Sequence, residues 1–344
     1  MRIIVASSAT IPGYSGGWTT TLDLLQEDHS PVYLIIGAPP GIHSMEGVEY
    51  VGLGIPDRRP TTLPGRLTGF LRRLAAPRAL EWVYRRYRAD FVLCLDEVSG
   101  FAALRAGVPY AMRFHSHVTE SLIGPPLDSL LAGALFSTAC QGSEVPGVEV
   151  LPHNQDLSRF EFPPAARPER ALLLTCINEE HDPLTFVEGV AGSRDMRGDI
   201  IGTGPLRDRV EKACGTTGGR VRCLDPVPRL STGRLSGKYQ VGVATLVERP
   251  DINNYQMKTS MYLACGMHTL VRPFSMMARN APRFVHTFDD AKGLSRALDR
   301  VQEDWESLED GRREAREWVM KNCSVDIPRR RFREILEQTF GGIR

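Results

Sequence analysis

Lys258, Thr259 and Ser260 place one ammonium group and two hydroxyl groups within a single turn of chain. The residues that follow are largely apolar up to Gly266, which predicts a helix that begins near these side chains and ends at the glycine. The first turn of a helix has unpaired N–H groups and the positive end of the helix dipole, and both favour anions. We therefore predict that this turn binds a diphosphate.

Lysine is rare in this chain, which contains five lysines and thirty-seven arginines. Lys258 is therefore not easily explained as random surface charge. Asn254 stands just before it, where its side chain can cap the helix, and we assign Asn254 to the same anion site.

Two glycine-containing turns each follow a predicted strand. Gly16 and Gly17 precede a helix, and glycines there allow backbone amides to approach a phosphate or a sugar closely. Gly202, Gly204 and Pro205 form the second turn, which lacks the third glycine of a dinucleotide-binding fingerprint. For both turns, a tight structural connection between strand and helix is the alternative interpretation.

Arg113, His115 and His117 lie at the end of a predicted strand, where open α/β sheets bind ligands. The two histidines could hold a metal, but no third ligand is apparent nearby, so we favour polar contacts to a sugar hydroxyl or a phosphate. A histidine that is merely hydrogen-bonded at the strand end is the alternative. Glu97 follows another predicted strand, and we assign it to acceptor binding together with Arg113 and His117.

Short β-rich runs alternate with helical patterns, which predicts an α/β protein with parallel sheets covered by helices. The alternation pauses at the proline-rich segment 162–168, and the length of 344 residues suits two domains. We predict one domain at 1–160, a second at 161–326, and a final helix at 327–344 that completes the first. The predicted strands are 3–6, 32–36, 91–95, 110–114, 148–151, 171–175, 199–201, 221–224, 241–245, 268–271 and 284–287.

The segment 57–90 contains nine arginines against three acidic residues. Apolar residues recur at helical spacing, which predicts two amphipathic helices, broken at Pro77, with a basic outer face. This face, within residues 58–88, could contact anionic lipid at the membrane periphery, receive an anionic acceptor, or simply be solvated.

The composition excludes several classes of protein. A net charge of +1 and a charged fraction of 24% give no global nucleic-acid signature. The seven cysteines are scattered without a C-x-x-C pair, which indicates a reducing, cytoplasmic setting and no zinc centre. No apolar run approaches the ~20 residues of a membrane span, and the run after Met1 is too short for a signal peptide.

Several motifs together resemble the retaining glycosyltransferases of the GT-B fold, the large family-four group. Residues 150–160 are similar to the family's v-i-P-N-G-V-D-x-x-R-F segment, and 201–206 to its i-G-x-G-P-L turn. Residues 16–17 resemble its first glycine loop, and His115 the histidine that contacts the sugar. Residues 253–266 are similar to N-N-P-x-K-x-S-x-Y-L-A-x-G in some short glucosyl- and galactofuranosyltransferases.

This resemblance implies two Rossmann-like domains that face each other across a cleft. It implies an enzyme that moves a sugar from a UDP- or GDP-sugar to an acceptor hydroxyl, with retention and without a metal or cofactor. Lys258 and His115 would be catalytic, and the acceptor would be a glycan, a lipid-linked molecule or a small molecule. We expect the protein itself in the cytoplasm, with peripheral contact at the inner membrane face as a further possibility. The residues implied to bind the donor are Gly16, Gly17, His181, Gly202, Gly204, Pro205, Asn254, Thr259 and Ser260.

Four positions differ from the family pattern. Asn253 and Met261 stand where the family has two glutamates, and Cys176 and His181 stand where it has an arginine and a lysine. A methionine cannot accept the hydrogen bonds that a glutamate accepts from a ribose, and a histidine is cationic only when protonated. A non-catalytic subunit that binds a partner or a sugar nucleotide is therefore the main alternative. A GT-B epimerase is another, and it would need carboxylates such as those at 96–97.

Overall fold

The chain forms two compact units in the computed structural model. Unit 1 comprises Met1–Gln155 and Val325–Arg344, and unit 2 comprises Asp156–Ser324. Leu157 and Phe160, which the sequence analysis placed in the first domain, pack into the core of unit 2. The structure describes residues 1–7, 16–25, 31–36, 38–45, 48–54, 63–115, 125–140, 143, 145–152, 154–164, 166–227, 233–234, 238–248 and 257–341. At 16–20, 45, 48, 63–74 and 125–126 it describes only the backbone.

Unit 1 is built on an eight-stranded sheet with the order β3-β4-β2-β1-β5-β6-β7-β8. All neighbouring strands are parallel except β3 and β4. The strands are β1 (Ile3–Ser7), β2 (Val32–Ile35), β3 (Gly41–Met45), β4 (Val48–Gly52), β5 (Phe91–Cys94), β6 (Tyr110–Phe114), β7 (Ser137–Ala139) and β8 (Val148–Val150). The helices are α1 (Gly16–Leu25), α2 (Leu63–Tyr87), α3 (Glu97–Ala106), α4 (Pro125–Gly133) and α12 (Asp326–Phe340).

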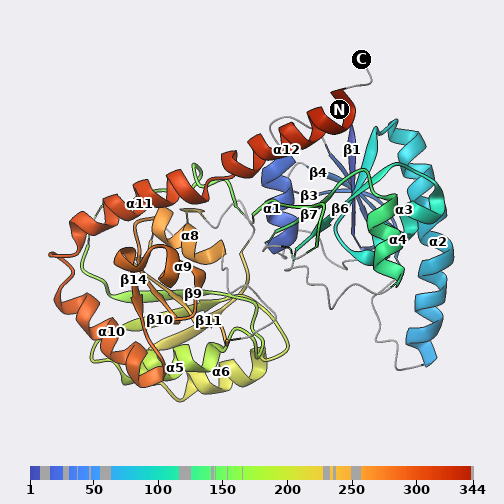
Figure 1. Cartoon of the computed structure of the whole chain (residues 1–344). Helices are drawn as coiled ribbons and strands as arrows, with labels where there is room; N and C mark the ends of the chain where they lie inside the picture. The colour runs from blue at the N-terminus through green and yellow to red at the C-terminus, as the bar shows by residue number, and fades with distance from the viewer. Residues whose placement is uncertain are drawn as a thin grey trace. The chain divides into compact units, whose positions relative to one another are not determined.

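Helices cover both faces of this sheet, with α2, α3 and α4 on one side and α1 and α12 on the other (Figure 1). Successive strand residues alternate between the two apolar layers, as Ile4 and Ala6 do on the α2 side and Ile3 and Val5 on the α1 side. The C-terminal helix joins the second layer through Phe332, and the buried Arg329 donates hydrogen bonds to the carbonyl of Asp23 on α1.

Two features of unit 1 differ from the sequence prediction. The predicted break at Pro77 was wrong, because α2 is a single helix with Pro77 inside it. Ala76, Leu80 and Val83 pack into the core on either side of the proline, and this packing offsets the backbone hydrogen bond that proline cannot donate. The antiparallel pair β3 and β4 was not predicted, and neither was β7.

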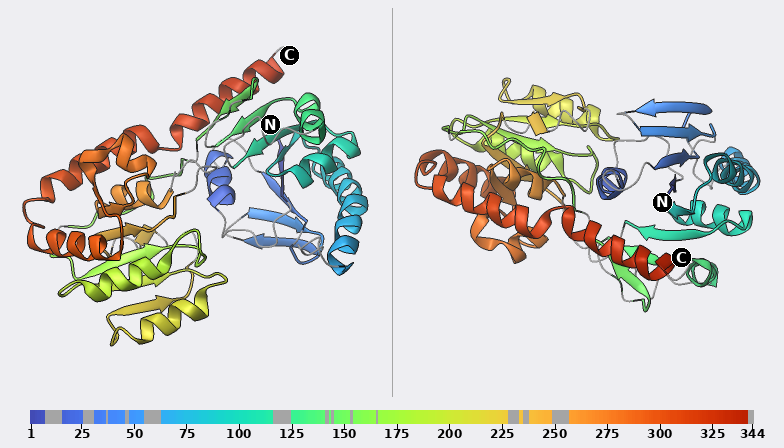
Figure 2. Two further views of the ribbon diagram at one scale, coloured as in Figure 1. Left: turned by 60° about the horizontal axis from the view of Figure 1, so that its bottom comes forward. Right: turned by 90° about the horizontal axis from the view of Figure 1, so that it is seen from above.

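Unit 2 is built on a six-stranded sheet with the order β11-β10-β9-β12-β13-β14, in which all described pairs are parallel. The strands are β9 (Arg170–Leu174), β10 (Arg197–Ile201), β11 (Val221–Leu224), β12 (Val241–Ala244), β13 (His268–Val271) and β14 (Val285–Thr287). Figure 2 shows both sheets from two further sides, each with helices along it. The helices are α5 (Pro183–Gly192), α6 (Arg207–Gly215), α8 (Met257–Ala264), α9 (Met276–Asn280), α10 (Ala291–Glu303) and α11 (Glu309–Cys323), with a 3-10 turn at Pro282–Phe284. Together the two sheets confirm the predicted α/β architecture.

The C-terminal end of α8 is fixed by α11. Gly266 follows α8 with a left-handed φ of 67°, and a Cβ atom there would lie 2.2 Å from the ring of Phe162. From α11, the side chains of Arg312 and Arg316 donate hydrogen bonds to the carbonyls of Gly266 and Ala264, and both guanidinium groups lie over the Phe162 ring. Cations at this end of a helix also interact favourably with its dipole. The position of the Lys258 end of α8 therefore depends on these contacts at its other end.

Candidate functional site

Lys258 lies near the carboxyl ends of the unit 2 strands. Its Nζ atom donates a hydrogen bond of 3.2 Å to Oγ1 of Thr175, which directly follows β9, and the lysine residue is half-buried. Burial lowers the pKa of Lys258 to about 7, although Cys176 and Glu180 act in the opposite direction. A bound anion would restore the positive charge, so the predicted diphosphate-binding lysine is suitably placed on its own unit.

The two hydroxyl residues beside Lys258 are buried. Thr259 and Ser260 are each 1% exposed, and the Ser260 hydroxyl donates a 2.8 Å hydrogen bond to the carbonyl of Met257 within the helix. Met261 is also buried, at 4% exposure, and packs in the apolar core of unit 2. The family position of a ribose-binding glutamate is thus a core position here. Asn254 lies outside the described residues.

His181 is neutral in this site. Burial, and then the charge of Lys258, lower its pKa to about 3. Its Nδ1 atom lies 2.8 Å from the carboxamide oxygen of Asn178, which can only accept, so Nδ1 carries the proton and Nε2 is left as an acceptor. His181 can hydrogen-bond a hydroxyl group but does not replace the lysine of the family. Partial burial raises the pKa of the Cys176 thiol more than the nearby Lys258 lowers it, so this position supplies no positive charge.

Gly202 and Gly204 allow two loops to pack backbone against backbone. A Cβ atom on Gly202 would lie 1.8 Å from the Thr175 carbonyl oxygen, and one on Gly204 would lie 2.3 Å from that of Ile177. Backbone hydrogen bonds from Thr175 N to Ile201 O and from Ile177 N to Thr203 O join the same loops. These contacts support the structural interpretation of the turn, and they hold Thr175, the hydrogen-bond acceptor of Lys258. Pro205 is exposed in this turn.

Arg272 is a further cation at the carboxyl end of this sheet, and the sequence analysis missed it. It directly follows β13, and its Nη2 atom lies 3.7 Å from Oδ2 of Asp182. Its guanidinium also contacts the carbonyl of Asp289 and lies over the ring of Phe288, while its buried Nε atom has no hydrogen-bond partner among the described residues. Asp182 has a left-handed φ of 41°, which is uncommon outside glycine.

Three predicted residues of unit 1, Glu97, Arg113 and His115, lie at the carboxyl ends of described strands. Gly16 and Gly17 form the first turn of α1, and the exposed Glu97 begins α3. Arg113 is buried on β6, and Nδ1 of His115 lies 3.8 Å from Sγ of Cys140. His117 lies outside the described residues.

Asp96, beside Glu97, is engaged in local structure. Its carboxylate caps α3 by accepting a hydrogen bond from the Ser99 backbone N–H, and it also accepts one from the Ser7 hydroxyl. These contacts occupy the carboxylate that the epimerase interpretation would require as an acid or base.

Comparison with solved structures gives matches along almost the whole chain. Sucrose-phosphate synthase from Thermosynechococcus elongatus matches with a TM-score of 0.76 at 14% identity, covering 99% of each chain. HepE from Anabaena, solved with UDP and glucose, matches with a TM-score of 0.73 at 11% identity, covering 98% of this chain and 100% of HepE. An E. coli structure described as trehalose-6-phosphate bound with UDP-2-fluoro glucose matches at 0.68 and 12% identity, covering 98% and 99%.

The chain has the GT-B fold. This confirms the predicted fold, with two Rossmann-like units. No model of a known protein family matches the chain, and no curated protein does. The fold is therefore retained here with a sequence that has diverged widely from those neighbours.

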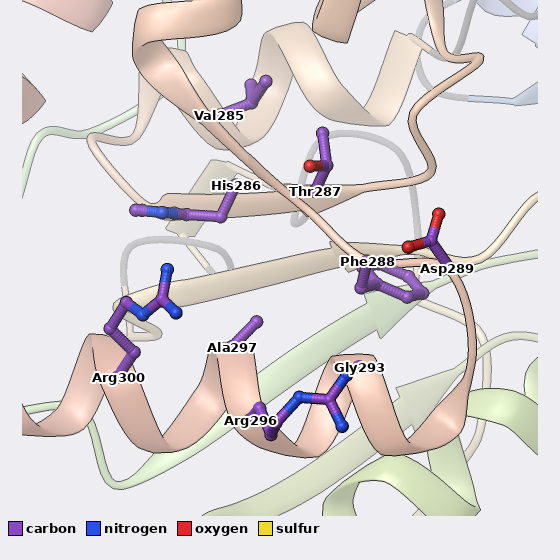
Figure 3. A pocket seen from close by; sticks show the side chains of 9 residues that line it. All are labelled: Val285, His286, Thr287, Phe288, Asp289, Gly293, Arg296, Ala297 and Arg300. Atoms are coloured by element: carbon purple, nitrogen blue, oxygen red, sulfur yellow. The ribbon is translucent and has the colours of Figure 1, made fainter.

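The GT-B second unit also has a groove of about 390 Å³ between the edge strand β14 and helix α10 (Figure 3). Arg296 and Arg300 line it from α10, and His286 lines it from β14. None of the residues predicted to bind the donor lines this groove.

Within the described ranges, no group of three or more His, Cys, Asp and Glu side chains could hold a metal ion. None of the helices described for this GT-B chain is long and apolar enough to cross a bilayer. On α2, Trp82 is 49% exposed, and Arg86 lies over its ring.

Proposed function

We propose that this protein is a glycosyltransferase that uses a nucleotide diphosphate sugar as its donor. The observation that carries the proposal is the match, over nearly the full length of each chain, to GT-B proteins solved with UDP or a UDP-sugar. Lys258 supports it, because a lysine half-buried near the carboxyl ends of parallel strands is suited to a diphosphate.

In the proposed reaction, the acceptor hydroxyl oxygen bonds to the anomeric carbon while the bond from that carbon to the diphosphate breaks. The acceptor proton leaves with the diphosphate or passes to water. Lys258 and Arg272 would stabilise the charge that develops on the departing diphosphate, which needs no metal ion. His115 would contact the sugar, and Gly16 and Gly17 would approach the donor through backbone amides. Retention of configuration is part of the proposal and rests on the family resemblance.

To test the proposal, the protein is incubated with a panel of sugar nucleotides, and the UDP or GDP released is measured by chromatography. In the Lys258→Ala protein, we expect kcat/KM to fall by about 10²–10³-fold, since one cation at the leaving group is lost. Lys292→Ala is the matched control, because Lys292 is exposed on α10 and should be replaceable without loss. Wild-type turnover in Lys258→Ala would rule out the role of this lysine.

A non-catalytic, sugar-nucleotide-binding subunit is the second candidate. It is favoured by the neutral His181 and by the burial of Met261, since both weaken the donor site relative to the family pattern. Calorimetry with the same sugar nucleotides, combined with product analysis after long incubation, separates the candidates. Binding without any product supports the subunit, whereas slow transfer or hydrolysis supports the enzyme.

We also propose that the basic face of α2 contacts membranes peripherally. The exposed Trp82 and Arg86 are suited to an interface that contains anionic lipid. Flotation with vesicles containing phosphatidylglycerol tests this, and equal flotation of Trp82→Ala and wild type would contradict it.

A further inference from the structure

Arg113 is a buried cation within the sheet of unit 1. It lies on β6 and is only 1% exposed. Among the described residues it is the largest fully buried side chain. Its Nε and Nη1 atoms have no hydrogen-bond partner among those residues. Because guanidinium groups stay protonated in proteins, β6 holds a full positive charge whose N–H groups are not all satisfied.

Among the described residues, no carboxylate forms an ion pair with Arg113. Arg113 shares a face of β6 with Ala111, which packs in the apolar layer formed with α1 and α12. Its strand partner on β7 is Thr138, whose hydroxyl donates to the Met112 carbonyl. Burial raises the pKa of the Cys140 thiol more than the nearby Arg113 lowers it, so this thiol also stays neutral.

A buried charge that has no counter-charge among the described residues of its surroundings opposes folding. Apolar side chains of similar volume at such positions are often neutral or stabilising, so stability does not explain the arginine. A ligand would explain it. Arg113 is the next-to-last residue of β6, and the ends of parallel strands are where α/β folds bind ligands.

We infer that the acceptor carries an oxyanion, either a phosphate ester or a carboxylate, which Arg113 binds. This inference rests on the proposed glycosyl transfer. The planar guanidinium donates paired N–H groups that fit both oxyanions, and a buried contact of this kind is stronger than one in water. The donor diphosphate has Lys258 and Arg272 as candidate cations in unit 2, so Arg113 in unit 1 is assigned to the acceptor.

The first test compares thermal unfolding of wild type and Arg113→Met without ligand. Methionine has a similar length and no charge, so we expect the melting temperature to rise by roughly 2–8 °C. A purely structural arginine would give the opposite sign. Arg105→Met, at an exposed position on α3, is the control and should change the melting temperature little.

The second test measures binding of glucose 6-phosphate, other monosaccharide phosphates and glucuronate by calorimetry, with glucose as the neutral counterpart. We expect at least one anionic sugar to bind wild type at least tenfold more tightly than its neutral counterpart. That preference should disappear in Arg113→Met and persist in Arg105→Met. Phosphates and uronates form separate arms, so the experiment also identifies which oxyanion is bound.

Three results would overturn the inference: a lower melting temperature in Arg113→Met, no preference for any anionic sugar in wild type, or loss of UDP binding alone in Arg113→Met. The last would assign Arg113 to the donor. If the Arg113→Met protein does not fold, binding of the charged and neutral sugars to wild type still tests the inference. Arg113→Lys then serves as the second variant. Binding of UDP to wild type and to Lys258→Ala tests the proposed function separately, so the two failures are distinguishable.

Discussion

Lys258 is a partly protonated amine in the free protein, and this makes donor binding dependent on pH. Its pKa is about 7, and a bound diphosphate should raise that pKa towards its ordinary range. Above about pH 7, binding must therefore take up a proton, so affinity for the donor should fall as pH rises, by up to about tenfold per unit. Below about pH 7 the amine is already charged, and this dependence should vanish.

Calorimetry with a UDP-sugar between pH 6 and pH 9, in two buffers of different ionisation enthalpy, measures the proton uptake directly. Lys258→Arg is the control, because a guanidinium stays charged across this range. Equal pH dependence in wild type and Lys258→Arg would show that another group takes up the proton.

At the scale of single residues, the sequence predicted some positions and not others. Lys258 could be found because a lysine in a first helical turn is a local pattern and lysine is rare in this chain. Arg272 could not be singled out among thirty-seven arginines, although its place directly after an apolar strand was a signal. The burial of Arg113 and Ser260 depends on packing by distant segments, which a local pattern does not contain.

At the scale of elements, the end of α8 provides a stability test. Gly266→Ala adds a Cβ where φ is 67° and where the Phe162 ring lies only 2.2 Å away. Left-handed backbone and the displaced ring should together lower the free energy of unfolding by about 2–4 kcal/mol, measured by urea denaturation.

Gly311→Ala is the matched control for this change. Gly311 lies within α11 and a Cβ there would meet no atom within 4 Å. Alanine is the better helix former, so this variant should gain about 0.5–1 kcal/mol. Two Gly→Ala changes of opposite sign would support the packing described for α8, and a neutral Gly266→Ala would refute it.

Helices and strands were largely predictable wherever an apolar run and the turn residues at its ends indicated the same boundaries. The helix end at Gly266 and the strands of unit 2 follow this rule. β3 was not predicted because Gly41–Met45 mixes glycine, histidine and serine with apolar residues. Its apolar residues do not alternate with polar ones in the way that marks a half-buried strand. At Pro77 the prediction relied on an intrinsic preference, and packing of α2 on the sheet overrode it.

At the scale of the whole molecule, the two units should respond separately to damage in α12. Phe332 is buried against the sheet of unit 1, close to Phe136. Phe332→Ala should destabilise unit 1 by about 3–5 kcal/mol by leaving a cavity. Hydrogen exchange followed by mass spectrometry should then show faster exchange in β1, β5 and β6, and unchanged exchange in β9, β12 and β13.

Arg330→Ala, on the exposed side of the same helix, is the control and should alter neither unit. Equal loss of protection in both units of Phe332→Ala would mean that they unfold as one cooperative body. That result would contradict the expectation that the two compact units unfold separately.

The division has a consequence for biosynthesis. Unit 2 is one continuous stretch of chain, whereas unit 1 needs residues from both sides of that stretch. A ribosome makes the whole of unit 2 before it makes α12, and domains generally fold as units during synthesis. We therefore expect unit 1 to stay incomplete while unit 2 is being made, so that the apolar face covered by α12 is exposed to chaperones during that interval.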